Sequence, residues 1–237
     1  MYIYAIMRKT ETKLELPANG IAFELKAIAV GNLLALVEPL LTIAALEKLE
    51  EKALIQAVLS HDRIICETFK QQTLLPLRFG TCFISPEALE NHLLQHQEEY
   101  LQQLACLTDK AEYCIKCVPR EAPTPTIPSS AKGREYFLAK KQRYQTQQDF
   151  QAEQAQQWLF VQQKLAQYYP NALITPQGNT QKIYILGNFI RARIPSRPED
   201  PFLSQQVQNW QQTCSHWEFY LGEPLPPYHF VTQTINS

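Results

Sequence analysis

The sequence predicts an α+β protein of two domains, and three observations lead to this fold class. The chain has 237 residues, more than a typical domain of roughly 100 to 200 residues. Hydrophobic residues make up 45% and charged residues 19%, so a sizeable core is available and intrinsic disorder is excluded as the main state. The pattern of predicted elements changes near residue 110. We therefore expect an N-terminal α+β domain at 1–110 and a C-terminal domain at 111–237.

Three segments rich in aromatic and β-branched residues predict strands at the N-terminus: 2–6, 23–30 and 33–37. Gly31-Asn32 separates the last two, which is typical of a hairpin turn. These strands are expected to form the sheet of the first domain.

The rest of the first domain alternates helix, strand and helix. Apolar residues at loosely helical spacing predict a helix over 46–69, with a break expected near Ser60-His61-Asp62. Residues 74–83 predict a strand in which Gly80 marks a bend. A second helix is expected over 85–107, because Ser85 is a suitable N-cap and proline and glutamate follow it.

The second domain has an informative order of elements, namely strand, helix, strand, strand, helix, strand. This β-α-β-β-α-β order is that of a ferredoxin-like fold, and the ranges are 113–118, 133–169, 172–175, 183–189, 201–214 and 217–221. The segment from Gly222 to Val231 contains three prolines that restrict its backbone. We expect this segment to fold back on the N-terminal domain.

The helix over 133–169 is unusually long, about 54 Å at 1.5 Å per residue. Its middle has few apolar residues and many glutamines, so it either protrudes or breaks into two helices. Two interpretations of the glutamines stay open, a solvated helix face and a partner-binding surface.

Charge separates the two halves of the chain but indicates no charged partner. Residues 1–110 carry 10 basic and 14 acidic groups, a net charge of −4, and residues 111–237 carry 12 and 9, a net charge of +3. The whole chain has a net charge of −1, which does not favour nucleic acid or an anionic membrane. No apolar run approaches the roughly 18 residues of a membrane span, and no signal peptide is recognisable. We expect an intracellular, cytoplasmic protein.

The residues that carry chemistry do not form a recognisable catalytic set. Phosphate-binding and nucleophile motifs are absent, and the chain has seven glycines. Neighbouring residues on a helix point in different directions, so His61-Asp62 is better explained by capping or a surface ion pair than by catalysis. Cys114 and Cys117 fall on opposite faces of a strand. The sequence therefore predicts no catalytic, cofactor-binding or metal-binding residues and no enzyme activity.

Five blocks, in order along the chain, resemble the GvpF/GvpL family of gas vesicle proteins. They are the opening Met1–Ile6, His61-Asp62, Leu75–Thr81, Gly133–Lys141 and Gly222–Val231. The sequence departs from the family in the last block, where Leu225 stands for a common tryptophan and His229 for a serine.

The resemblance implies a non-enzymatic accessory or minor structural protein of gas vesicle assembly, located at the vesicle and without a cofactor. The implied partners are the small hydrophobic shell protein and other accessory gas vesicle proteins. We place the partner contacts at the bent strand and the start of the long helix, on Arg78, Arg134, Tyr136, Lys140 and Lys141, where intramolecular ion pairs are an equal alternative. The rival function is that of a small-molecule-binding protein or enzyme using a cleft between the domains.

Overall fold

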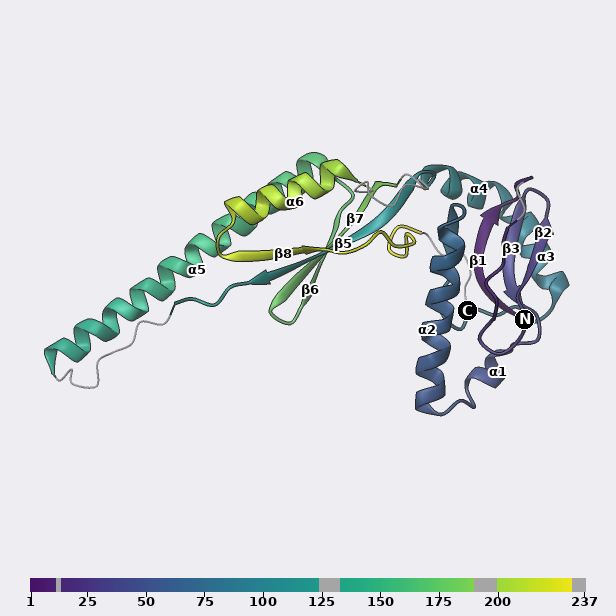
Figure 1. Ribbon diagram of the computed structural model, residues 1–237, viewed down its shortest axis with the longest axis horizontal. Coiled ribbons are helices and arrows are strands. Elements are labelled where there is room, and N and C mark those ends of the chain that lie inside the picture. Colours follow the sequence, from purple (N-terminus) through teal and green to yellow (C-terminus); the bar gives the residue numbers. More distant parts are fainter. Residues whose placement is uncertain (12–13, 124–132, 190–199, 232–237) are drawn as a thin grey trace. The chain divides into compact units, whose positions relative to one another are not determined.

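The computed structural model describes residues 1–11, 14–123, 133–189 and 200–231. The chain divides into two compact units. The described residues of unit 1 fall within Met1–Glu112, Asn188–Ser196 and Pro224–Ser237, and those of unit 2 within Tyr113–Gly187 and Arg197–Glu223. Each unit is built on its own sheet of four strands (Figure 1).

The sheet of unit 1 is antiparallel, with the strand order β2-β3-β1-β4. Its strands are β1 (Tyr2–Arg8), β2 (Lys26–Val30), β3 (Leu33–Glu38) and β4 (Leu74–Pro76). The hairpin predicted between the second and third strands is confirmed, and its turn holds Gly31 at a φ of 55°, a left-handed conformation that glycine adopts without strain. The first six residues of β1 are all buried, so this strand lies at the centre of the core.

The helices of unit 1 differ in two places from the sequence prediction. They are α1 (Ile43–Leu46), α2 (Glu51–Phe69), α3 (Pro86–Gln95) and α4 (Gln97–Cys106). The break predicted near Ser60-His61-Asp62 is wrong: α2 is continuous there because the polar ring of His61 is buried and hydrogen-bonded. The helix predicted over 85–107 instead divides at His96.

The strand predicted over 74–83 is also shorter than expected. It ends at Pro76, whose backbone nitrogen has no hydrogen to donate to a neighbouring strand. Leu77 still donates a backbone hydrogen bond to Tyr4 at 2.9 Å. Gly80 then takes a φ of 91° in a turn, and the chain returns to β1 at an isolated bridge between Tyr2 and Cys82.

Tyr2 and His61 form a polar network with backbone groups inside unit 1. The Nε2 atom of His61 lies 3.0 Å from the carbonyl oxygen of Leu77, and Nδ1 lies 2.8 Å from the hydroxyl of Tyr2. A carbonyl oxygen only accepts, so Nε2 donates and Nδ1 accepts, which is the neutral form of imidazole. Burial lowers the pKa of His61 to about 4 and thereby favours this form.

A buried carboxylate fixes the loop that precedes β2. Glu38 is fully buried at the end of β3 and accepts hydrogen bonds from the backbone N–H groups of Ile21, Ala22 and Phe23, at 2.8, 2.8 and 2.5 Å. It also accepts one from the hydroxyl of Tyr4. Four donors around one carboxylate replace the water that burial removes.

Unit 2 has the β-α-β-β-α-β element order that the sequence predicts. The elements are β5 (Lys110–Pro119), α5 (Arg134–Tyr168), β6 (Leu173–Gln177), β7 (Thr180–Asn188), α6 (Pro201–Thr213) and β8 (Trp217–Leu221), and the strand order is β6-β7-β5-β8. The long helix is a single element of 35 residues. In β5, Ile115 and Cys117 are buried and Lys116 is exposed, as the predicted alternation requires.

The C-terminal segment lies on unit 1. The backbone of Leu225 exchanges two hydrogen bonds with that of Glu112, at 2.9 and 2.8 Å. His229 donates from its backbone nitrogen and from Nδ1 to the buried carboxylate of Glu112, both at 2.7 Å. The hydroxyl of Tyr228 donates to Asp62 on α2 at 2.5 Å.

The buried neutral ring of His61 predicts that stability depends on pH. The unfolded chain binds a proton at the ordinary pKa of about 6.5 and the folded chain only near pH 4. Stability is therefore fully present above pH 6.5 and falls as the pH drops toward 4, by about 3 kcal/mol in total. Urea unfolding followed by circular dichroism at a series of pH values measures this loss.

The His61→Gln variant should lose this part of the pH dependence, since glutamine does not titrate. His96→Gln, at a half-buried position between α3 and α4, serves as the control and should keep it. Parallel pH profiles for the wild type and His61→Gln would contradict the assignment.

Candidate functional site

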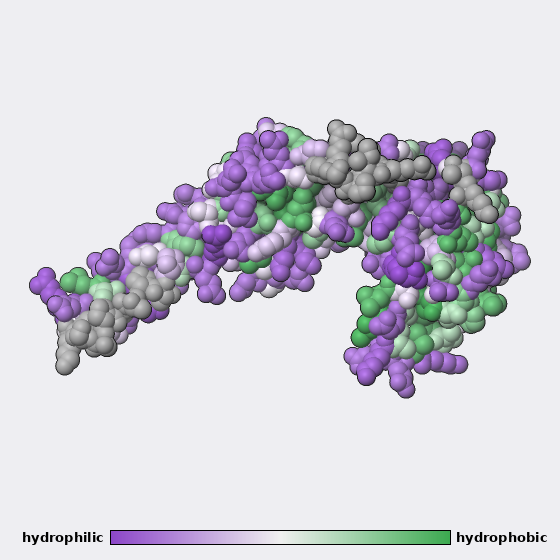
Figure 2. Space-filling model, in the orientation of Figure 1, coloured by the Kyte–Doolittle hydropathy of each residue, from purple (hydrophilic) through white to green (hydrophobic). Residues whose placement is uncertain are grey.

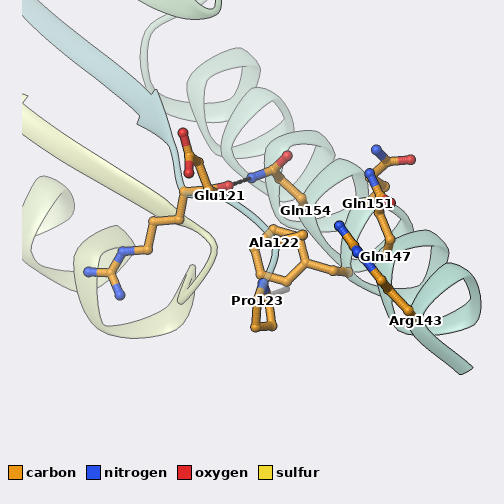
Figure 3. A pocket seen from close by; sticks show the side chains of 9 residues that line it. Glu121, Ala122, Pro123, Arg143, Gln147, Gln151 and Gln154 are labelled. Atoms are coloured by element: carbon orange, nitrogen blue, oxygen red, sulfur yellow. Dashed lines mark hydrogen bonds between the residues drawn. The ribbon is translucent and has the colours of Figure 1, made fainter. Parts of the chain in front are cut away.

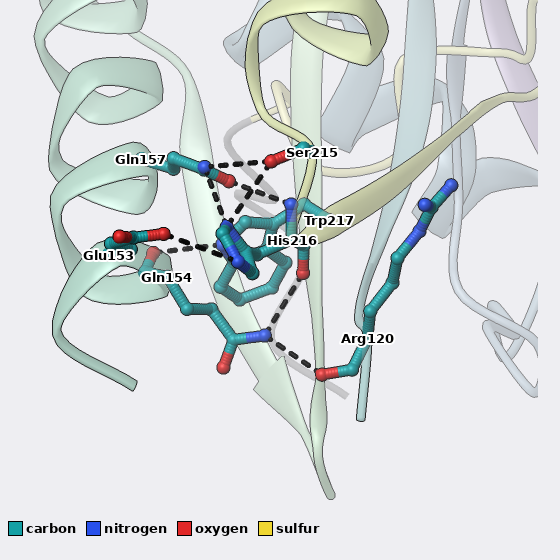
Figure 4. Close-up of polar contacts among 7 residues, drawn as sticks. All are labelled: Arg120, Glu153, Gln154, Gln157, Ser215, His216 and Trp217. Carbon is teal, nitrogen blue, oxygen red and sulfur yellow. Dashed lines mark hydrogen bonds and ion pairs between the residues drawn. The ribbon is translucent and has the colours of Figure 1, made fainter. Parts of the chain in front are cut away.

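The second half of α5 is anchored to unit 2 by glutamine side chains (Figure 4). The Nε2 atom of Gln154 donates to the carbonyl oxygens of Arg120 and His216, both at 3.0 Å. Gln157 lies 2.7 Å from Nδ1 of His216 through Nε2 and accepts from the His216 backbone N–H at 2.9 Å through Oε1. This half of the glutamine-rich stretch is therefore a packing surface and not a solvated face.

Aromatic and apolar contacts complete this anchor. The indoles of Trp158 and Trp217 stack with their centres 4.9 Å apart, and Trp217 donates from Nε1 to the carbonyl of Gln154 at 3.0 Å. Val161 and Leu165 are buried, and they are the only residues of α5 that are. Phe150 and Glu153 also contact His216, by a ring contact at 4.1 Å and an ion pair at 3.5 Å, so the anchor of α5 extends from residue 150 to its C-terminal end.

The first turns of α5 are exposed although they carry large apolar side chains. We call Arg134–Tyr144 the α5 tip. Its exposed fractions are 42% for Tyr136, 71% for Phe137, 57% for Leu138 and 63% for Tyr144. The tip also contains four basic residues and one acidic residue, Arg134, Lys140, Lys141, Arg143 and Glu135, which gives it a net charge of +3.

Helical spacing divides the α5 tip into two opposite faces. Tyr136, Lys140, Arg143 and Tyr144 share one face and line a cavity of about 300 Å³; we call it the Tyr136 face. Arg134, Leu138 and Lys141 lie on the other side of the helix from Tyr136, and Phe137 lies at their border, next to Tyr144; we call Arg134, Phe137, Leu138 and Lys141 the Leu138 face.

A polar groove continues from the Tyr136 face along the helix (Figure 3). It has a volume of about 320 Å³ and is lined by Arg120, Glu121, Ala122, Pro123, Arg143, Gln147, Phe150, Gln151 and Gln154. Small-molecule sites are usually lined mainly by apolar side chains. The charged and amide side chains of this groove are better suited to contact with the polar surface of another protein than to binding a small molecule.

Burial keeps one histidine and two cysteines of the described residues in their neutral forms. Both ring nitrogens of His61 are occupied by hydrogen bonds. Burial raises the pKa of Cys66 to about 11 and that of Cys117 to about 12, so both thiols are protonated and weakly nucleophilic at neutral pH. No group of three potential metal ligands is found among the described residues, and no helix in the described part of the chain is long and apolar enough to span a membrane.

The structure places four of the five predicted contact residues on one element. Arg134, Tyr136, Lys140 and Lys141 belong to the α5 tip and are exposed, but they divide between its two faces. Arg78 belongs to unit 1, where it is exposed in the turn after β4, and its carbonyl accepts from the Thr81 backbone and hydroxyl. In the described part of the chain, none of these basic residues forms an ion pair.

Sequence reasoning missed other exposed apolar residues. The exposure of Phe137, Leu138 and Tyr144 could have been predicted, because they are large side chains in a helix that lacks a sustained apolar stripe. The first half of α2 was missed because helical spacing alone does not show where a helix extends past its sheet. Ala53, one of the apolar residues in the range of the predicted helix over 46–69, is exposed.

The glutamine anchor predicts a loss of stability on truncation. Gln157→Ala removes three contacts to Ser215 and His216 and leaves a partly buried backbone N–H without its acceptor. We expect a loss of about 1 to 3 kcal/mol, measured by thermal unfolding. Gln148→Ala, exposed on the same helix, should change stability by less than about 0.5 kcal/mol; equal effects of the two changes would contradict the anchor.

Comparisons with known proteins agree on one family. The family model described as "Gas vesicle synthesis protein GvpL/GvpF" matches residues 1–232. "Gas vesicle protein F" of Streptomyces sp. (strain CB03234) is 30% identical over 118 residues, which are 48% of this chain and 47% of that protein. The match thus spans about half the length of this curated relative.

Two crystal structures share the fold. GvpF from Anabaena sp. PCC7120 gives a TM-score of 0.67 at 16% identity and covers 100% of this chain and 97% of its own. GvpF from Microcystis aeruginosa gives 0.58 at 15% identity, with 97% of each chain covered. At such identity these likenesses establish the fold alone, and the family follows from the model that matches nearly the whole sequence. The chain belongs to the GvpL/GvpF family of gas vesicle synthesis proteins.

Proposed function

We propose that this protein acts in gas vesicle assembly by binding the hydrophobic shell protein, with other accessory gas vesicle proteins as further partners. Its place of action would be the vesicle, and it would act without catalytic turnover. Family membership supports the role, and the exposed α5 tip supports direct binding. The single observation that carries the proposal is a helix anchored over one half and exposed with large aromatic side chains over the other.

The Tyr136 face is the proposed contact for the shell protein. Tyr136 and Tyr144 offer large apolar surfaces with a polar hydroxyl, and Lys140 and Arg143 lie between them at the same cavity. Aromatic and arginine side chains dominate binding energy at protein interfaces. Most of the energy would come from apolar burial, so binding should survive high salt, which screens exposed ion pairs.

We also infer a domain assignment for the two units. The strand order β6-β7-β5-β8 and the β-α-β-β-α-β element order support a ferredoxin-like topology for unit 2. The proposed domain boundary near residue 110 is supported by the change from unit 1 to unit 2 between Glu112 and Tyr113.

A pull-down of purified shell protein tests the proposed function. Tyr136→Ala and Lys140→Ala should weaken retention by roughly tenfold, because alanine removes the buried contacts of an interface centre. The matched controls are Tyr220→Ala and Lys116→Ala, which remove exposed residues of the same kinds from the sheet of unit 2. Arg78→Ala tests the separate prediction on unit 1.

Each outcome separates the function from the site. No retention of shell protein by the wild type at low or high salt would refute direct binding. Retention unchanged in Tyr136→Ala, Lys140→Ala and Arg78→Ala would refute the site assignment only.

A further inference from the structure

A second exposed apolar surface lies on unit 1, at the first half of α2. Leu54, Ile55, Val58 and Leu59 are exposed by 38%, 51%, 42% and 56%; we call these four residues the α2 face. No charged residue occurs between Ala53 and His61. Figure 2 shows hydrophobic residues gathered around α1 and this part of α2. Single exposed apolar residues are ordinary, but a contiguous group of this size indicates an interaction surface.

The packing of α2 explains why this surface is open. From His61 onward the helix buries His61, Ile64, Ile65, Thr68 and Phe69, whereas Ala57 is the only buried residue before it. The first turns therefore make few contacts with the rest of unit 1. Their apolar side chains are not needed for the core of unit 1.

Charges flank the α2 face at both ends. Glu51, Ile55, Val58 and Asp62 follow one another at spacings of four, three and four residues, so they form one stripe of the helix with an acidic residue at each end. Residues 47–62 contain four acidic and two basic side chains, a net charge of −2. A complementary partner presents apolar side chains between basic ones.

The Leu138 face of the α5 tip has this complementary pattern. Arg134, Leu138 and Lys141 follow at spacings of four and three residues, and Phe137 lies beside them. The stripe is thus apolar with a basic residue at each end, opposite in sign to the α2 stripe. Within the described residues, Arg134, Lys141 and Glu51 form no ion pair that would have to be broken.

The lengths of the two stripes are compatible. Seven residues separate Arg134 from Lys141 and eleven separate Glu51 from Asp62, which are about 10 and 16 Å along a helix. The long side chains of arginine and lysine reach outward past their own Cα atoms and span the difference.

We propose that the Leu138 face of the α5 tip of one molecule binds the α2 face of a second copy of this chain. The two surfaces differ, so the contact is heterologous: in a pair, one molecule keeps a free α2 face and the other keeps a free Leu138 face. Such contacts extend into head-to-tail chains or close into rings. The proposal does not depend on shell protein, because both surfaces belong to this chain.

Sedimentation of the purified full-length protein over a concentration series tests the proposal. The wild type should form species larger than the monomer as its concentration rises. Ile55→Ser and Leu138→Ser should each weaken association by about tenfold, because each removes an apolar side chain that the contact buries. Leu94→Ser and Leu159→Ser change leucines of similar exposure on α3 and in the second half of α5, and they should associate like the wild type.

Mixing the two variants distinguishes a heterologous contact from a symmetric one. A mixture of Ile55→Ser and Leu138→Ser retains one intact surface of each kind, so it should form dimers and no larger species. A wild type that stays monomeric at every concentration would overturn the proposal. A mixture that associates no better than its two components would also overturn it. Normal association of either variant alone would do the same, because that result is expected from a symmetric contact through a single surface.

Discussion

The uneven anchoring of α5 is the constraint on which the proposed surfaces depend. A helix of 35 residues is longer than its sheet requires, and only its second half makes the contacts that stabilise it. Gln154 and Gln157 are hydrogen-bonded to His216 in the loop before β8, and Trp217, the first residue of β8, donates to the carbonyl of Gln154. Because one end is fixed by specific hydrogen bonds, the other end can expose aromatic side chains without losing its helical geometry.

The same arrangement occurs on a smaller scale in unit 1. The second half of α2 is fixed by His61 in the polar network and by the contact of Asp62 with Tyr228, and the first half is exposed with four large apolar residues. In both helices specific polar contacts stabilise one half, and the other half carries the exposed apolar side chains of the proposed intermolecular contacts. Neither exposed half contributes much to the core of its unit, so its sequence can be adapted to a partner at little cost in stability.

A role in assembly fits these surfaces better than a catalytic role does. An enzyme positions a nucleophile or base with a shifted pKa in a cleft. In the described residues, several of the shifted groups are instead buried and hydrogen-bonded within the core, as His61 and Tyr2 are, or are thiols that burial keeps protonated, such as Cys117. Exposed aromatic and basic side chains on the first half of α5 are suited to binding, and the two faces of the α5 tip would give the two proposed partners, a shell subunit and a second copy, separate surfaces.

The sequence by itself determined the elements of unit 2, the hairpin of unit 1 and the family, because turn residues, alternation and short motifs are local signals. It did not determine that α2 continues through His61, because the ring of His61 is held by Tyr2 and Leu77, which are distant in sequence. Nor did it determine that regular pairing stops at Pro76 and returns only at the bridge between Cys82 and Tyr2. The candidate contact residues on α5 stay a prediction. Only the tertiary structure showed which helix halves are anchored, and hence that Phe137, Leu138 and the α2 face are exposed, because burial is decided by where a helix extends past its sheet.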